Sequence, residues 1–247
     1  VDEGWVRTQP GVILDELNRH LEPTGFHFAP DPSTSNRSNV GGALGNNSCG
    51  AHSIVWGKTI DNVSELRAVL SNGDLATLGF VDQESLLTKT KLGGLEADIY
   101  RTLFSIGEIN REEILARYPK ILRRVSGYNL DELVKDGCFD MARFVIGSEG
   151  TLLTITEAKL RIVPLPKMKA LAVMHFRELI ESIEATVAIR DLGATAVELI
   201  DSTIIRQART NLKYARMMDF VQDDPEAILI VEVTGDSERE LVSKLDN

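Results

Sequence analysis

"NVGGALGNNSCGAHSIVWGKT", residues 39–59, is the stretch that decides the fold. It holds five glycines, three asparagines, two serines and one cysteine, with almost no charge. Glycines let the main chain approach a ligand closely and adopt positive φ, so that successive N–H groups can converge on an anion. The pattern is neither a P-loop nor the Gly-x-Gly-x-x-Gly fingerprint of dinucleotide-binding folds. A pyrophosphate fits it, and a structural tight turn is the alternative.

A second glycine cluster, "GSEGTLLTIT" at residues 147–156, follows the apolar run "RFVI" and leads into a strand-like segment. Such a Gly-x-x-Gly segment between two strands is often a bulged hairpin. The alternative is that the two glycine clusters face each other across one extended ligand. A dinucleotide cofactor has that extent.

Composition excludes several classes of protein. The chain has 247 residues, a formal net charge of −10 and two cysteines, Cys49 and Cys138. The charge argues against nucleic acid as a partner, and two cysteines make neither a disulfide scaffold nor a four-cysteine iron–sulfur site. The basic run "RYPKILRR", residues 117–124, is interpreted as a solvated helix face, or else as a site for an anionic ligand. No apolar run approaches the roughly 20 residues that span a bilayer.

The order of elements suggests two domains. A strand at residues 4–11, a helix at 12–23 and a long loop from about 29 to 52 come first. A hairpin around Asn72-Gly73 and a helical region at 83–134 follow, and we expect strands in "ARFVIG" and in "TLLTITEAKLRIVPLP". Beyond Pro166, strands alternate with helices, which suggests a layered sheet with helices on one face, as in a ferredoxin-like half. From the way the sequence begins and ends, we expect this chain to be a fragment of a longer protein.

Three motifs carry a family resemblance: "PDPSTSNRSNVGGALGNNSCGAHSIVWGKTIDNV" (30–63), "RRVSGYNL" (123–130) and "GSEGTLLTITEAKLRIVP" (147–164). In this order they resemble FAD-linked dehydrogenases of the vanillyl-alcohol oxidase and p-cresol methylhydroxylase superfamily. The branch is that of glycolate oxidase, D-lactate dehydrogenase and D-2-hydroxyglutarate dehydrogenase. The resemblance implies an α+β fold: a p-cresol methylhydroxylase-type FAD-binding domain at 1–166, lacking its N-terminal part, then the start of a ferredoxin-like substrate (cap) domain at 167–247.

The resemblance also assigns roles to residues of this chain. The flavin and ribityl side would be lined by Pro30, Asp31, Ser33, Thr34, Ser35 and Asn39. The pyrophosphate and its neighbouring atoms would be held by Gly41, Gly42, Asn46, Asn47, Ser48 and Gly50. From the second cluster, the cofactor would be contacted by Glu149, Gly150, Thr151, Ile155 and Thr156. Tyr128 would order the wall near the site.

The implied function is oxidation of a D-2-hydroxy acid, D-2-hydroxyglutarate or D-lactate, with hydride transfer to flavin N5 and electrons passed to an acceptor other than NAD. A non-catalytic flavin-binding module and a fragment that binds no cofactor stay open, and we expect this fragment alone to be inactive. The eight residues "VKDGCFDM" (134–141) favour a long bacterial branch with an iron–sulfur domain. An iron–sulfur cluster and a divalent metal therefore belong to a longer protein. We expect a cytoplasmic location, with any membrane contact peripheral at the inner membrane, and leave room for an oligomer.

The remaining candidates offer no catalytic residue. The histidines His20, His27, His52 and His175 are too scattered for a metal-ligand spacing, so a packed or surface role is the default. Cys49 is interpreted as a small buried residue rather than as a reactive thiol or flavin anchor. The acids Asp61, Glu198 and Asp201 form no evident pair for acid–base work. The chemistry must then come from the cofactor.

Overall fold

The computed structural model describes residues 3–135 and 139–246, so Cys138 lies outside the described residues. The chain divides into two compact units. The first comprises Val1–Gly50 and Trp56–Leu165, and the second comprises Ala51–Val55 and Pro166–Asn247. The strand β8 (Met168–Phe176) pairs within the second unit, while β6 (Thr154–Arg161) pairs within the first.

The first unit is built on a five-stranded antiparallel sheet with the order β1-β6-β3-β4-β5. Its other strands are β1 (Trp5–Thr8), β3 (Val63–Val69), β4 (Leu75–Val81) and β5 (Phe139–Asp140). A separate two-stranded sheet joins β2 (Phe26–His27) to β7 (Val163–Pro164). The hairpin predicted at Asn72-Gly73 is confirmed as the β3–β4 turn, in which Gly73 has a φ of +90°. The positive φ explains why glycine stands there.

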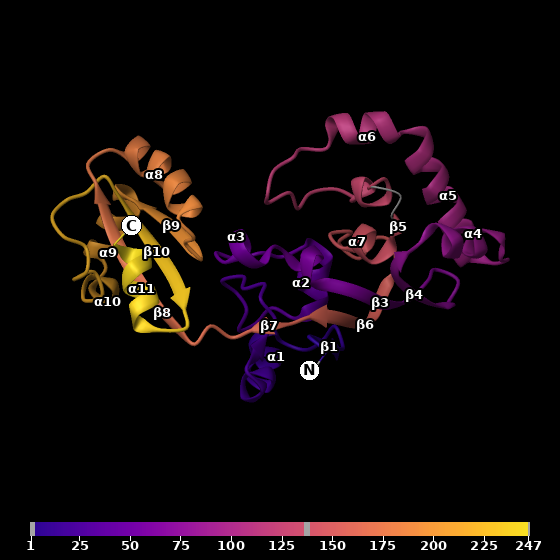
Figure 1. Cartoon of the computed structure of the whole chain (residues 1–247), viewed down its shortest axis with the longest axis horizontal. Helices are drawn as coiled ribbons and strands as arrows, with labels where there is room; N and C mark the ends of the chain where they lie inside the picture. Colours follow the sequence, from indigo (N-terminus) through magenta and orange to yellow (C-terminus); the bar gives the residue numbers. More distant parts are fainter. Residues whose placement is uncertain (1–2, 136–138, 247) are drawn as a thin grey trace. The chain divides into compact units, whose positions relative to one another are not determined.

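The helices up to residue 165 are α1 (Leu14–Leu21), α2 (Val40–Asn46), α3 (Ser53–Trp56), α4 (Gln83–Lys91), α5 (Leu95–Ile109), α6 (Arg111–Arg117) and α7 (Met141–Val145) (Figure 1). The 3₁₀ turns are η1 (Glu22–Thr24), η2 (Thr59–Asn62) and η3 (Leu130–Leu133). Residues 53–55 of α3 belong to the second unit. Buried residues of α1, α2 and α7 join those of β3, β4 and β6 in one hydrophobic core. That core fixes the glycine-rich segments against the sheet.

The long loop expected at residues 29–52 is partly helical. Asn39 begins α2, and its side-chain oxygen accepts a hydrogen bond of 2.6 Å from the backbone N–H of Gly42. Val40, Ala43 and Leu44 are buried on one face of this helix. An N-cap asparagine and a short apolar stripe outweigh the poor helix propensity of three glycines, because tertiary packing overrides propensity.

The strand predicted in "ARFVIG" is wrong, because these residues form α7. Asp140 caps this helix by accepting a hydrogen bond of 3.0 Å from the N–H of Arg143. Apart from Arg143, the residues of α7 are buried. An apolar run buried on most sides has no periodicity that separates a helix from a strand. The second glycine cluster therefore connects a helix, rather than a strand, to β6.

The helical region predicted at 83–134 is confirmed for α4, α5 and α6 and ends at Arg117. Residues 118–129 have no regular structure. The basic run at 117–124 is thus not a helix face, and most of it lies in an irregular segment. Pro119 explains part of this difference, since the residue before a proline is driven out of the α region.

The second unit contains a three-stranded antiparallel sheet with the order β8-β10-β9. Its other elements are α8 (Leu179–Asp191), β9 (Ala196–Asp201), α9 (Ser202–Thr210), α10 (Leu212–Ala215), β10 (Ala227–Gly235) and α11 (Glu238–Leu245). Neighbouring residues of β10 join different clusters, Leu229 with Ile189 of α8 and Ile228 with Ile205 of α9. Because adjacent strand residues point to opposite faces, helices cover both faces of this sheet rather than the one expected.

Across residues 3–135 and 139–246, we find no helix that combines the length and apolar character needed to cross a bilayer.

Candidate cofactor site

The N-terminus of α2 is closed by contacts within the chain. The N–H of Gly42 donates to Asn39, and the N–H of Gly41 donates to the carbonyl of Pro10 over 2.8 Å. A Cβ added at Gly41 would lie 2.8 Å from the Cβ of Pro10, so glycine is required for this close packing. Gly42 is exposed. A pyrophosphate at this point would approach the bare surface of Gly42 rather than free N–H groups.

The C-terminus of α2 is joined directly to the second glycine cluster. The N–H of Gly147 donates to the carbonyl of Leu44, and the N–H of Glu149 donates to the carbonyl of Gly45, each over 2.9 Å. The two clusters, far apart in the sequence, therefore form one continuous surface. They contact each other through the backbone, so an extended ligand would lie along them and not fill a gap between them.

The tip of the second cluster is exposed and has an unusual backbone. Glu149 has a φ of +54° and Gly150 a φ of +71°. Among the described residues, the N–H of Gly150 has no hydrogen-bond acceptor. Thr151 closes the turn, because its hydroxyl donates to the carbonyl of Ser148 over 2.6 Å, and it also hydrogen-bonds the hydroxyl of Tyr128 over 2.8 Å. Tyr128 thus contacts this loop directly, in keeping with the ordering role that the resemblance implies.

Asp31 and Gly50 lie in direct contact. A Cβ added at Gly50 would overlap the backbone carbonyl and the carboxylate of Asp31. The carbonyl of Gly50 also accepts a hydrogen bond of 3.0 Å from Arg123. Pro30 is buried just before this contact. The two ends of the 30–50 segment are consequently held together at a point where only glycine fits.

The turn at residues 33–38 is tied to the start of α1. The carbonyl of Ser35 accepts from the N–H of Asp15 over 3.3 Å, and the hydroxyls of Thr34 and Ser38 lie 2.7 Å apart. Ser33 is exposed. These contacts satisfy one of the N–H groups that a helix leaves open at its start. The hydroxyl of Ser33 remains on the surface of the turn.

The asparagines after α2 point in different directions. Asn47 is buried, has a φ of +51° and accepts a hydrogen bond of 2.9 Å from the N–H of Ile60. Asn46 is exposed, and its side-chain oxygen accepts a bond of 2.5 Å from the hydroxyl of Ser48. The carbonyl of Ser48 accepts from the N–H of Thr59. Asn47 therefore supports the fold, while Asn46 and Ser48 are available at the surface.

Ile155 and Thr156 are neighbours in β6, at a register shift in the pairing with β3, where Arg67 pairs with Glu157 and Ala68 pairs with Ile155. Ile155 packs against the hydrophobic core, and the hydroxyl of Thr156 donates to the carbonyl of Arg67 over 3.1 Å. The side chains of both residues are therefore engaged within the first unit.

Asp61, which the sequence shows as an isolated acid, belongs to a charged network. Arg143 donates to Asp61 over 3.1 Å and to Glu132 over 2.7 Å. Burial alone would raise the pKa of Glu132, but hydrogen bonds from Arg143 and Lys135 outweigh it and hold this pKa below its ordinary value. The pKa of Asp61 is lowered in the same way, by Lys58 and Arg143 against its burial. No local motif links these residues, so sequence reasoning missed the network.

Of the other candidates, His52, His175 and Asp201 have structural partners. In the second unit, Nε2 of His52 lies 2.7 Å from the carboxylate of Glu232, and Nε2 of His175 accepts from the N–H of Gln222. Asp201 caps α9. Glu198 is a residue of β9, and Cys49 is half-buried with a free thiol. Within residues 3–135 and 139–246, no cluster of three histidine, cysteine or acidic residues could hold a metal ion.

Comparisons with known proteins identify the relatives. A family model described as an FAD binding domain matches residues 1–79. D-2-hydroxyglutarate dehydrogenase of Escherichia coli is 36% identical over 96% of this chain, and the enzyme of Pantoea ananatis is 34% identical over 95%. This chain is a homologue of D-2-hydroxyglutarate dehydrogenases. The GlcD subunit of glycolate oxidase from Bacillus subtilis is a further homologue, 30% identical over 65% of this chain.

The dehydrogenase homologues are much longer, since the chain spans about a quarter of the length of these curated relatives. Among solved structures, alkyldihydroxyacetonephosphate synthase has a TM-score of 0.61 at 18% identity, over 99% of this chain and 37% of the other. That likeness concerns the fold alone. Together with the family match, it confirms the predicted α+β class with an FAD-binding domain of the p-cresol methylhydroxylase type.

Proposed function

We propose that this chain is part of an FAD-dependent dehydrogenase that oxidises a D-2-hydroxy acid to the 2-oxo acid. D-2-hydroxyglutarate is the first choice of substrate and D-lactate the second. The observation that carries the proposal is the similarity to D-2-hydroxyglutarate dehydrogenases over nearly the whole chain. The match of residues 1–79 to an FAD binding domain supports the choice of cofactor.

The residues present fit the cofactor. The joined glycine clusters offer a surface at the exposed Gly42 that a ligand can approach closely. At the exposed Gly150 they offer an N–H that has no acceptor in the described part of the chain, and an anionic oxygen can accept from it. The exposed Asn46, one turn after Gly42 in α2, adds a side-chain NH2 donor, while the hydroxyl of Ser48 donates to the side-chain oxygen of Asn46. We assign the pyrophosphate and its neighbouring atoms to this surface, and the flavin and ribityl side to the segment from Pro30 to Asn39. Thr151 and Tyr128 hold the second cluster in place.

When bound, FAD supplies the hydride acceptor that amino-acid side chains lack. Oxidation removes the hydroxyl proton to a base and the α-hydrogen with its electron pair, and it leaves the 2-oxo acid. No described residue is assigned as that base, so the catalytic residues are placed in the remainder of a longer protein. Electrons pass on to an acceptor other than NAD.

In this proposal, residues 1–166 are a partial FAD-binding domain and residues 167–247 begin a substrate (cap) domain. The compact units differ from these bounds in that residues 51–55 and Pro166 belong to the second unit. A longer protein would supply the iron–sulfur cluster and the divalent metal that the resemblance allows. We place the protein in the cytoplasm, with peripheral association at the inner membrane and oligomer formation as further parts of the proposal.

Anaerobic mixing of the longer, flavin-loaded protein with D-2-hydroxyglutarate tests the function. Bleaching of the flavin absorbance by D-2-hydroxyglutarate or D-lactate, and not by the L-enantiomers, is the expected result. A protein that holds flavin but is not bleached by either acid would support a non-catalytic flavin-binding module instead. A protein that holds no flavin would support the alternative in which no cofactor binds.

A further inference from the structure

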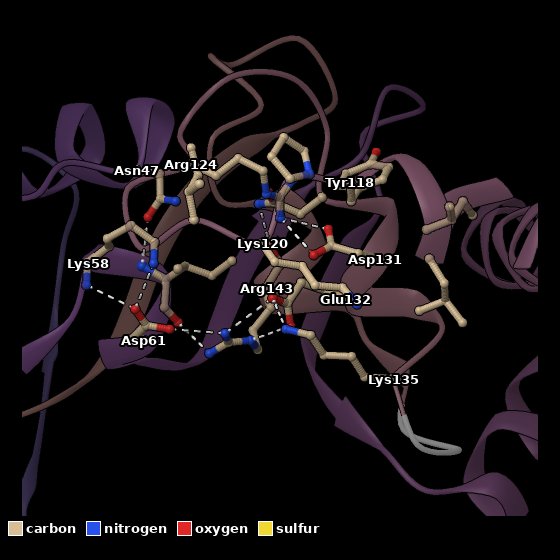
Figure 2. Close-up of a pocket in the computed structure, with 16 residues that line it drawn as sticks. Asn47, Lys58, Asp61, Tyr118, Lys120, Arg124, Asp131, Glu132, Lys135 and Arg143 are labelled. Carbon is tan, nitrogen blue, oxygen red and sulfur yellow. Dashed lines mark hydrogen bonds and ion pairs between the residues drawn. The ribbon is translucent and has the colours of Figure 1, made fainter. Parts of the chain in front are cut away.

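A charged cavity of about 300 Å³ lies within the first unit, behind the C-terminus of α2. The irregular segment after α6 forms one side of it, and η2, η3 and α7 supply most of the other. Asn47, which follows the last residue of α2, lines this cavity. Figure 2 shows the cationic side chains of this cavity, with dashed lines from Lys58, Arg124, Lys135 and Arg143 to the carboxylates that they bind.

The charge of the cavity opposes that of the chain. Among the described residues, five cationic side chains and three carboxylates line it, whereas the chain as a whole has a net charge of −10. The cations are Lys58, Lys120, Arg124, Lys135 and Arg143, and the acids are Asp61, Asp131 and Glu132. Two positive charges in this wall are therefore not balanced by lining carboxylates. A cavity with such an excess concentrates anions from solution.

Most of the cations are already engaged. Arg143 binds Asp61 and Glu132, and Lys135 lies 2.6 Å from Glu132. Lys58 lies 3.2 Å from Asp61. These contacts form one network of ion pairs in the lining of the cavity (Figure 2). The positive charge that a ligand could use must come from the two remaining cations.

Arg124 is only half satisfied. Its Nη2 donates to both carboxylate oxygens of Asp131, over 2.7 and 2.8 Å, and the guanidinium lies 4.7 Å from the ring centroid of Tyr118. Its Nη1 is buried and has no hydrogen-bond partner among the described residues. A buried charged donor without a partner is rare in folded proteins. The fixed Nη2 contacts hold Nη1 in place for an acceptor.

Lys120 is the cation of this cavity that pairs with no carboxylate among the described residues. It is exposed, lines the same cavity and makes no ion pair with any residue that the structure describes. Both residues belong to the basic run at 117–124. Ile114, Leu115 and Ile121 add an apolar patch to the same wall. The cavity therefore combines an unpaired lysine and a partly satisfied arginine with room for a short hydrocarbon body.

We propose that this cavity binds a small dianion, a short dicarboxylate or a phosphate group, whose oxygens accept hydrogen bonds from Arg124 Nη1 and Lys120. The ligand neutralises the two unbalanced charges and satisfies the buried guanidinium nitrogen. The cavity lining does not include Gly42, Asn46, Ser48 or Gly150 of the surface assigned to FAD, and the proposal does not depend on the proposed oxidation.

Calorimetric titration of the full chain with succinate and, separately, with inorganic phosphate tests the proposal at constant ionic strength. Saturable binding of at least one of these probes is expected. Lys120→Ala should weaken it about tenfold, because a charge-assisted hydrogen bond is lost. Lys91→Ala is the matched control, since Lys91 is a lysine of the same unit that does not line the cavity and pairs with no carboxylate in the described part of the chain. It should leave binding unchanged.

Arg124→Lys supplies a second test, because it keeps the charge and removes Nη1. It should also weaken binding, while the thermal midpoint of Lys120→Ala should match that of the parent protein. Preference for succinate identifies carboxylates as the ligand class, and preference for phosphate identifies phosphate groups. The absence of saturable binding by either probe, or equal binding by Lys120→Ala and the parent, would overturn the proposal.

Discussion

The backbone N–H of Glu149 donates to the carbonyl oxygen of Gly45 over 2.9 Å. This bond and its neighbour from Gly147 to Leu44 join two glycine clusters that lie far apart in the sequence. Because the joint is made by main-chain atoms, it tolerates side-chain changes at its surface. Substitutions that add bulk at a close backbone approach should, in contrast, disturb it.

Gly50→Ala should destabilise the first unit. The new Cβ would overlap the carbonyl and carboxylate of Asp31, and overpacking of this kind costs about 1–3 kcal/mol. Urea denaturation measures the change, and Gly11→Ala is the control because a Cβ there meets nothing within 4 Å. Equal urea midpoints for Gly50→Ala and the parent would show that Asp31 moves aside freely.

Arg143→Ala should be strongly destabilising because it leaves Glu132 buried without its main partner. The side chain of Glu132 is only 6% exposed, and breaking a buried ion pair costs about 3 kcal/mol or more. The double variant Arg143→Ala/Glu132→Gln should recover part of the loss, since no buried charge is then stranded. A double-mutant cycle from denaturation curves gives the coupling, and strictly additive losses would contradict the network.

Stability should fall as the pH falls through the carboxyl range. The pKa of Glu132 in the folded protein lies below its ordinary value of 4.5, and that of Asp61 lies below 3.8. Each group therefore stabilises the fold above those values and loses this contribution as the pH falls toward its folded pKa. Urea midpoints between pH 7 and about pH 3 should decline less steeply in Glu132→Gln than in the parent. If the urea midpoints of the two proteins declined in parallel, Glu132 would not contribute to the pH dependence of stability.

Tyr128→Phe should loosen the second glycine cluster without unfolding the protein. The variant loses the 2.8 Å hydrogen bond to Thr151, and a bond of this kind contributes about 0.5–1.5 kcal/mol. Amide hydrogen exchange should rise at residues 148–151, and the global urea midpoint should change little. Tyr214→Phe, at an exposed tyrosine of the second unit, is the control. Unchanged exchange at 148–151 would show that Tyr128 does not order the loop.

Short sequence motifs predicted the elements whose backbone conformation depends on a few adjacent residues. Asn72-Gly73 located the β3–β4 turn because a positive φ is needed there. The helix α7 was misread because its residues are buried on most sides. Burial is a tertiary property, and an apolar run alone does not reveal it.

The candidate site was predicted as a set of residues but not as a geometry. The sequence shows that Gly41 and Gly42 matter, yet it does not show that Gly41 packs on Pro10 while Gly42 faces outward. The contacts of Arg143 with Asp61 and Glu132 were invisible, because each partner comes from a different segment. Such pairs depend on the final topology, and sequence spacing contains no record of them.

The flavin content of Gly42→Val tests the central claim most directly. A Cβ at Gly42 would meet only the side-chain oxygen of Asn39, at 3.1 Å, so the fold should survive while the bare surface proposed for the pyrophosphate is covered. Gly93→Val is the matched control, since a Cβ there meets nothing within 4 Å. The ratio of bound FAD to protein, measured on the longer protein purified with each change, should fall to near zero in Gly42→Val and stay at the parent value in Gly93→Val. Full flavin content in a folded Gly42→Val protein would contradict the account.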